Sequence, residues 1–107
     1  MPVKIKCIGE VVTAYLSGEL DHHTAKAMRE EIDAAVELNM PSLLIIDFSD
    51  ITFMDSSGIG LVMGRYRNLS KTGASLQVTG TGENIFKMMK LAGIDRLAKI
   101  EKGACAK

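Results

Sequence analysis

The spacing of hydrophobic and polar residues changes several times along the chain, and each change predicts a new strand or helix. Apolar residues alternate with lysines over 3–7, and after a tight turn at 9–10 the run 11–16 is apolar and β-branched. Such patterns are typical of strands, and a two-residue turn between them is typical of a hairpin. We therefore expect an N-terminal β-hairpin whose second strand is closed by residues 18–21.

A helix follows the hairpin and leads into a buried strand. Asp21 is a suitable N-cap, and apolar residues recur at helical spacing from about residue 22 to residue 39. Pro41 stops this helix, because proline lacks the N–H that would continue the hydrogen-bond ladder. The continuously apolar run 43–48 then predicts a central strand that helices cover on at least one face, reached by a crossover connection.

Two further helices and two further strands complete the pattern. A second helix is expected to begin at the serine pair 56–57 and to end at 72–73, with a strand over 75–79 after it. A third helix ends at Gly93, and residues 96–100 are expected to form a short last strand.

Length and composition restrict the class of protein. One domain spanning residues 1–107 is expected, and a domain of this size can bury a core without metal or disulfide staples. Its 13 basic and 13 acidic side chains give a net charge of zero, which argues against nucleic acid as a partner. Cys7 and Cys105 lack metal-ligand spacing, no apolar run reaches membrane-spanning length, and we expect no secretory leader. We expect a cytoplasmic protein with reduced thiols and no membrane insertion.

The segment 53–60, Phe-Met-Asp-Ser-Ser-Gly-Ile-Gly, holds the most informative residues. It places Ser56 and Ser57 at a helix N-terminus, where unpaired N–H groups suit a side-chain oxygen, a phosphate or an approaching partner. The simplest interpretation is that the serines cap the helix. A hydrolase would use one serine as a nucleophile, yet the G-x-S-x-G spacing is absent. His22 and His23 also point about 100° apart on a helix, so at most one can reach a serine, and we expect no catalytic residue.

No other cluster predicts a metal or cofactor site. Asp21, His22 and His23 lack the i, i+4 spacing that places metal ligands on one helical face, so a solvated helix start is expected there. The segment 80–82, Gly-Thr-Gly, lacks the third glycine of a dinucleotide-binding loop and is expected to be a turn.

Two motifs occur together in this chain. One is Gly-Glu-Leu-Asp-His-His-Thr-Ala over 18–25, and the other is the segment 53–60, which runs on to Gly-Arg-Tyr at 64–66. In both, the chain resembles the STAS-domain anti-sigma factor antagonists, in particular the antagonists of sporulation anti-sigma-F factors, and the similarity extends to about residue 100. The resemblance implies an α/β fold with a mixed sheet of four to five strands and helices packed mainly on one side.

For function, the resemblance implies regulated binding without catalysis or cofactor. The unphosphorylated antagonist of that family binds an anti-sigma factor that is also a serine kinase, which frees the sigma factor. Phosphorylation of a serine in the D-S-S-G motif switches the antagonist off. Alignment gives Ser56 as the acceptor and Ser57 as the alternative, and a phosphatase acting on phosphorylated Ser56 is implied as a second partner.

The same resemblance implies a partner-binding face made of Asp21, His22, Asp55, Ser56, Ser57 and Gly58. Both motifs follow strands, so we expect them side by side at one end of the sheet. Asp55 would cap the helix or orient the acceptor, and Gly58 would admit a partner backbone or shape the turn. Further along the helix, Tyr66 fits the apolar stripe, whereas Arg65 lies on the polar face as a solvated side chain or a contact.

Two points stay open at this level. A different function within the family is a STAS module of another regulatory complex, either stressosome-like or linked to a transporter. The tail 101–107 is too short and too glycine-interrupted for the amphipathic final helix of such domains, so that helix is expected to be missing or frayed.

Overall fold

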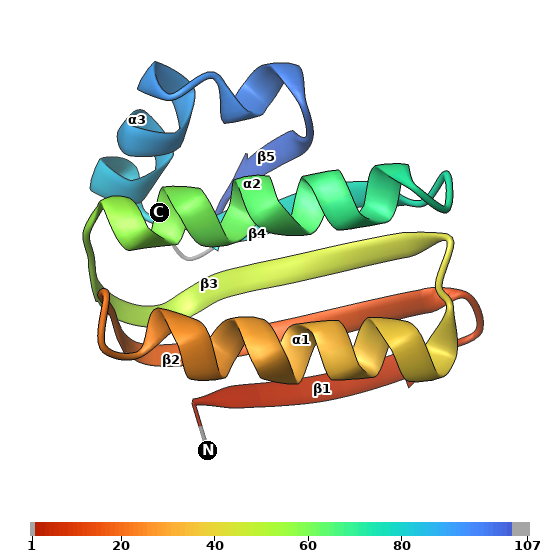
Figure 1. The fold of residues 1–107 in the computed structure, drawn as a ribbon. Coiled ribbons are helices and arrows are strands. Elements are labelled where there is room, and N and C mark those ends of the chain that lie inside the picture. Colours follow the sequence, from red (N-terminus) through yellow and green to blue (C-terminus); the bar gives the residue numbers. More distant parts are fainter. Residues whose placement is uncertain (1, 104–107) are drawn as a thin grey trace.

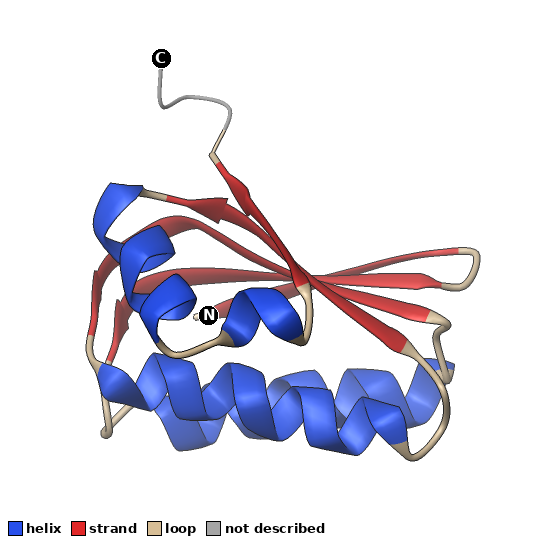
Figure 2. Cartoon of the chain, turned by 90° about the horizontal axis from the view of Figure 1, so that it is seen from above, coloured by secondary structure: helices blue, strands red, loops and turns tan. Residues whose placement is uncertain are grey.

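The computed structural model describes residues 2–103, which form a five-stranded sheet with the helices on one face (Figures 1 and 2). The elements are β1 (Val3–Ile8), β2 (Val11–Leu20), α1 (Ala25–Asn39), β3 (Leu43–Met54), α2 (Ser56–Ser70), β4 (Ser75–Thr81), α3 (Glu83–Leu91), a 3-10 helix (Ile94–Arg96) and β5 (Lys99–Lys102). β1 is antiparallel to β2, and β2 to β5 are parallel neighbours in chain order. The predicted fold class, a mixed sheet with one-sided helices, is confirmed.

The sequential strand order explains why the helices share one face. Each parallel strand is added on the same side of the one before it, and crossover connections are right-handed, so every connecting helix falls on the same face (Figure 2). That face holds the core, which is built from alternate strand residues and the inner stripes of the helices. Its largest fully buried side chains include Leu16, Leu20, Met28, Ile32, Leu44, Ile46, Phe48, Val62, Leu69 and Met89.

β3 is twice as long as its apolar run predicts, and it is irregular. It pairs with β4 only as far as Asp47↔Thr79, but it continues beside β2 as far as Leu20↔Met54. Along the way the register with β2 shifts twice, and each shift places one extra residue on β3. Such bulges bend a strand and increase its twist, so the second half of β3 follows β2 and parts from β4.

The first helix begins at Ala25, three residues later than expected, and Asp21 is not its N-cap. The carboxylate of Asp21 instead accepts hydrogen bonds from the backbone N–H groups of His23 (2.9 Å) and Thr24 (3.1 Å), which closes a separate turn. Thr24 occupies the cap position, and its hydroxyl is directed to the carbonyl oxygen of Glu19 at 2.8 Å rather than to the helix. A short side chain that bonds locally competes with helix formation, which delays the start of α1.

The C-terminal region also differs in detail from the sequence expectation. The last strand is shifted to Lys99–Lys102, because Ile94–Arg96 form a 3-10 helix after the positive-φ residue Gly93. Gly80 and Thr81 end β4 instead of forming a turn. The expectation of a missing or frayed final helix concerns a tail of which 104–107 lie outside the described residues.

Candidate functional site

Two loops meet at the carboxyl ends of β2 and β3. Leu20 and Met54, the last residues of these strands, are paired in the sheet, and the backbone N–H of Asp55 donates to the carbonyl oxygen of Leu20 at 3.2 Å. The turn that begins at Asp21 therefore lies beside the junction between β3 and α2. The two sequence motifs meet at one end of the sheet, as predicted.

Asp55 caps helix α2. Its backbone is extended, and its carboxylate accepts a hydrogen bond from the N–H of Ser57 at 2.8 Å, while its carbonyl oxygen accepts from the N–H of Gly58 at 3.0 Å. The expectation that the serines cap the helix is therefore wrong, because both already belong to its first turn. Asp55 satisfies one of the orphan N–H groups of that turn and adds a negative charge where the helix dipole favours it.

The two serines differ in their surroundings. Ser56 is the first residue of α2 and its side chain is exposed, whereas Ser57 is half-buried. Ser57 lines a groove between α1 and α2 together with Arg29 and Gly60. Neither hydroxyl makes a hydrogen bond to another of the described residues, 2–103. The arrangement presents the hydroxyl of Ser56 to solvent at a helix N-terminus, a position that tolerates an added anion.

Gly58 is buried, and its lack of a side chain serves internal packing. A Cβ at this position would overlap the side chain of Met54 and lie 3.2 Å from Cδ2 of Leu20. The glycine thus lets the first turn of α2 sit directly on the ends of β2 and β3. Of the two roles the sequence leaves open for Gly58, close approach of a partner backbone does not fit a residue that faces the interior.

Asp21 and the two histidines form the outer region of the site. Partial desolvation works to raise the pKa of Asp21, but the hydrogen bonds from the N–H groups of His23 and Thr24 outweigh it, so the pKa lies below its ordinary value. The carboxylate is therefore ionised at neutral pH. His22 and His23 are exposed, with ring centroids 3.9 Å apart. This loop offers an anionic group and two imidazole rings to an approaching partner.

Arg65 is buried between α1 and α2, which corrects its expected place on the polar face. Its Nε lies 2.7 Å from Oδ1 of Asp33 on α1, and its side chain is 7% exposed. One terminal nitrogen also donates to the carbonyl oxygen of Leu61 at 3.3 Å. Burial lowers the pKa of Arg65 and the charge of Asp33 opposes that effect. The pair clamps the two helices, whereas Tyr66 packs against the core as expected.

The structure also bears on metal binding and on membrane crossing. Within residues 2–103, no group of three or more His, Cys, Asp or Glu side chains is placed to hold a metal ion. No helix among those residues is long and apolar enough to cross a membrane.

A family model of the STAS domain matches residues 2–103, and the chain belongs to this family. The anti-sigma F factor antagonist of Lysinibacillus sphaericus is 34% identical over 85 residues, which cover 79% of this chain and 73% of that protein. The anti-sigma-B factor antagonist of Bacillus subtilis (strain 168) is 30% identical over 92 residues, covering 82% of this chain and 83% of that protein.

Solved structures agree with the family assignment. The anti-sigma factor antagonist SpoIIAA in its unphosphorylated form superposes with a TM-score of 0.79 and 28% identity, covering 92% of this chain and 86% of that one. The phosphorylated form of the Bacillus protein SpoIIAA gives a TM-score of 0.72 and 29% identity, with 92% and 89% covered. The chain thus shares its fold with a protein whose structure is known with and without phosphate.

Proposed function

We propose that this protein is an anti-sigma factor antagonist, which binds an anti-sigma factor and thereby releases a sigma factor to direct transcription, as in sporulation. The observation that carries the proposal is an exposed serine, Ser56, at the capped N-terminus of α2 in a STAS domain. Its relatives named as anti-sigma factor antagonists support the same interpretation. The protein would act in the cytoplasm through binding alone, without a catalytic residue or cofactor.

The proposed binding face combines the two loops at the end of the sheet. Asp21 and His22 lie on the turn after β2, and Asp55, Ser56 and Ser57 lie at the start of α2. The hydrogen bond between the N–H of Asp55 and the carbonyl of Leu20 holds the loops in a fixed relation. A surface that is preorganised in this way binds a partner without first losing loop entropy. Gly58 supports the face from beneath.

Phosphorylation of Ser56 by the anti-sigma factor itself, acting as a serine kinase, is the proposed off switch. A phosphoserine adds about −1.5 to −2 charges, next to the carboxylate of Asp55 and in the middle of the proposed face. If desolvating that charge costs about 3 to 4 kcal/mol, the partner binds some hundreds-fold more weakly. The helix N-terminus itself favours the anion, so the fold should survive the modification. A phosphatase would return the protein to its active form.

The direct test is to incubate the protein with its cognate anti-sigma factor and ATP and to map the modified residue by mass spectrometry. We expect one phosphate, on Ser56. The matched control is Ser57→Ala, which should be phosphorylated normally, whereas Ser56→Ala should not. A phosphate on Ser57 would move the switch by one residue, and no phosphate on either serine would overturn the proposed mechanism.

A further inference from the structure

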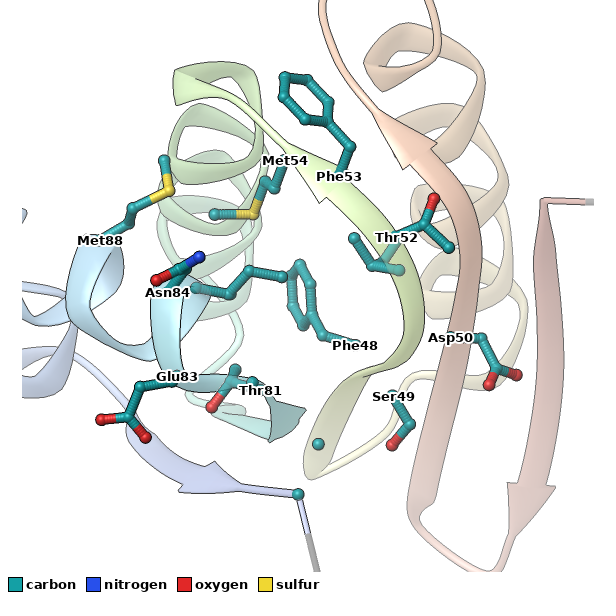
Figure 3. A pocket seen from close by; sticks show the side chains of 15 residues that line it. Phe48, Ser49, Asp50, Thr52, Phe53, Met54, Thr81, Glu83, Asn84 and Met88 are labelled. Atoms are coloured by element: carbon teal, nitrogen blue, oxygen red, sulfur yellow. The ribbon is translucent and has the colours of Figure 1, made fainter. Parts of the chain in front are cut away.

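A cavity opens where β3 parts from β4. Beyond Asp47↔Thr79 the two strands no longer pair, and the space between the second half of β3 and the start of α3 has a volume of about 730 Å³ (Figure 3). Small-molecule sites typically occupy about 300 to 1,000 Å³. The bulges of β3 are thus the structural cause of a hollow large enough for a ligand.

Gly80 makes room for the bend of β3. Gly80 has φ +72°, and a Cβ there would overlap the hydroxyl of Ser49 and lie 2.9 Å from its backbone nitrogen. Only glycine adopts this conformation readily and leaves room for the bent strand. The base of the cavity therefore depends on glycine at position 80.

The inner wall of the cavity is mainly apolar, with a polar edge. The apolar side chains that line it are Phe48, Ile51, Phe53, Met54, Ile85 and Met88. Figure 3 shows Phe48 on the β3 side of the space, and Thr81 and Asn84 on the side of β4 and α3. Thr81 is fully buried and donates its hydroxyl to the carbonyl oxygen of Glu101 at 3.1 Å, whereas the exposed amide of Asn84 can donate to a ligand or accept from it.

The charges around the opening are mostly negative. Asp50 and Glu83 are exposed and belong to the lining, and Glu83 is paired with Nζ of Lys102 at 3.3 Å. Lys102 thus offsets the negative charge of Glu83, and the negative charge of Asp50 remains. An anionic ligand would be repelled here, whereas a neutral or cationic one would not.

We propose that this cavity binds a small apolar molecule, neutral or cationic, with a body the size of two or three aromatic rings. The apolar wall contacts the body of the ligand, and Asn84 orients its polar group. The site does not depend on the proposed function, because it uses residues of β3, β4 and α3 rather than the exposed Ser56.

Ligand binding in this cavity has a direct route to the serine loop. Met54 lines the cavity and is also the side chain that packs on Gly58 in the first turn of α2. A ligand that contacts Met54 therefore changes the packing of Met54 against the turn that carries Ser56. The consequence for phosphorylation rests on the proposed function, whereas the binding and the contact do not.

The test of binding uses two fluorescent probes with the same body. N-phenyl-1-naphthylamine is neutral, and 8-anilinonaphthalene-1-sulfonate adds a sulfonate to the same skeleton. Both probes absorb at longer wavelengths than protein side chains, so their fluorescence can be followed in the wild-type chain and in tryptophan variants alike. We expect saturable binding of one neutral probe per chain, and binding of the sulfonate at least tenfold weaker. No saturable binding of the neutral probe, or equal affinity for both, would overturn the proposal.

Variants locate the bound probe. Met88→Trp should fill the cavity and weaken binding at least tenfold, whereas Leu91→Trp, on the same helix but at a residue 90% exposed, should leave it unchanged. Ile51→Trp fills the cavity from the opposite wall, so the result does not depend on one variant folding; circular dichroism checks each. Equal binding by the folded Met88→Trp and Leu91→Trp variants would place the probe elsewhere and overturn the site.

The route to the serine loop has its own readout. In amide NMR spectra, saturation with the neutral probe should shift the resonance of Gly58, while that of Gly73, in the turn after the far end of α2, should not move. Binding without a shift at Gly58 would overturn the route and leave the ligand site standing. Neither measurement involves the kinase, so a failure here is distinguishable from a failure to phosphorylate Ser56.

Discussion

At the scale of single residues, Asp55 determines how the serine pair is presented. Its carboxylate bonds to the N–H of Ser57, so the first turn of α2 is fixed and Ser56 faces solvent. A serine cap would have turned a hydroxyl back toward the helix. Because Asp55 and not a serine caps the helix, the capping group and the proposed phosphate acceptor, Ser56, are different residues.

The cap makes a measurable contribution to stability. Asp55→Ala should lower the free energy of unfolding by about 1 kcal/mol, because it leaves an N–H of the first turn unpaired. Asp55→Asn is the matched control and should cost only a fraction of this, since asparagine caps about as well. Urea denaturation of the three proteins compares them, and equal stability of the alanine and wild-type proteins would show that the cap contributes nothing.

The residue that the sequence misplaces most clearly is Arg65. By helical spacing it belongs to the polar face, and nothing in its neighbourhood on α2 suggests burial. Its partner Asp33 is far away in the chain and comes near only when α1 and α2 pack together. Sequence periodicity predicts which face of a helix is apolar, but not which charged side chain finds an ion pair inside a helix interface.

At the scale of elements, the pair of Arg65 and Asp33 joins the two longest helices. Asp33→Ala should lower the free energy of unfolding by about 2 kcal/mol, because it leaves the buried guanidinium without its countercharge. Arg65→Met, which keeps the length of the side chain and removes the charge, should cost less. The double variant should be more stable than the sum of the single losses predicts.

Thermal or urea unfolding of the four proteins completes this double-mutant cycle. Additive losses would mean that the two charges do not interact in solution, and would contradict the clamp.

The order of strands and helices could be predicted from the sequence, whereas the bend of β3 could not. The apolar run 43–48 marks the first half of the strand, but Ser49 and Asp50 look like the start of a loop. They stay in the strand because β2 continues to pair beside them, with two shifts of register. Bulges depend on two strands at once, so neither they nor the cavity beside them can be seen in one segment of sequence.

The start of α1 differs from its prediction for a related reason. Asp21 has the chemistry of an N-cap, and sequence alone does not show whether its carboxylate closes a turn or caps a helix. Bonds from His23 and Thr24 settle that choice in favour of the turn. The site that results still contains the residues the motifs single out, because both motifs end strands that are neighbours in the sheet.

At the scale of the whole molecule, the residues of the proposed function lie at one end of a two-layer domain. The helices cover one face of the sheet, and the two loops lie at the carboxyl ends of β2 and β3 (Figure 1). A phosphate on Ser56 would sit at the helix N-terminus, where its charge is favourable for the fold. The switch would then act on the binding surface and not on the structure that carries it.

The sharpest test of this switch is calorimetric titration of the anti-sigma factor with the unmodified protein and with the protein phosphorylated on Ser56. We expect the phosphate to weaken binding some hundreds-fold, while the free energies of unfolding of the two forms in urea stay within about 1 kcal/mol of each other. Weaker binding accompanied by a large loss of stability would show instead that phosphorylation acts by unfolding the domain. Equal affinity of the two forms for the anti-sigma factor would contradict the switch altogether.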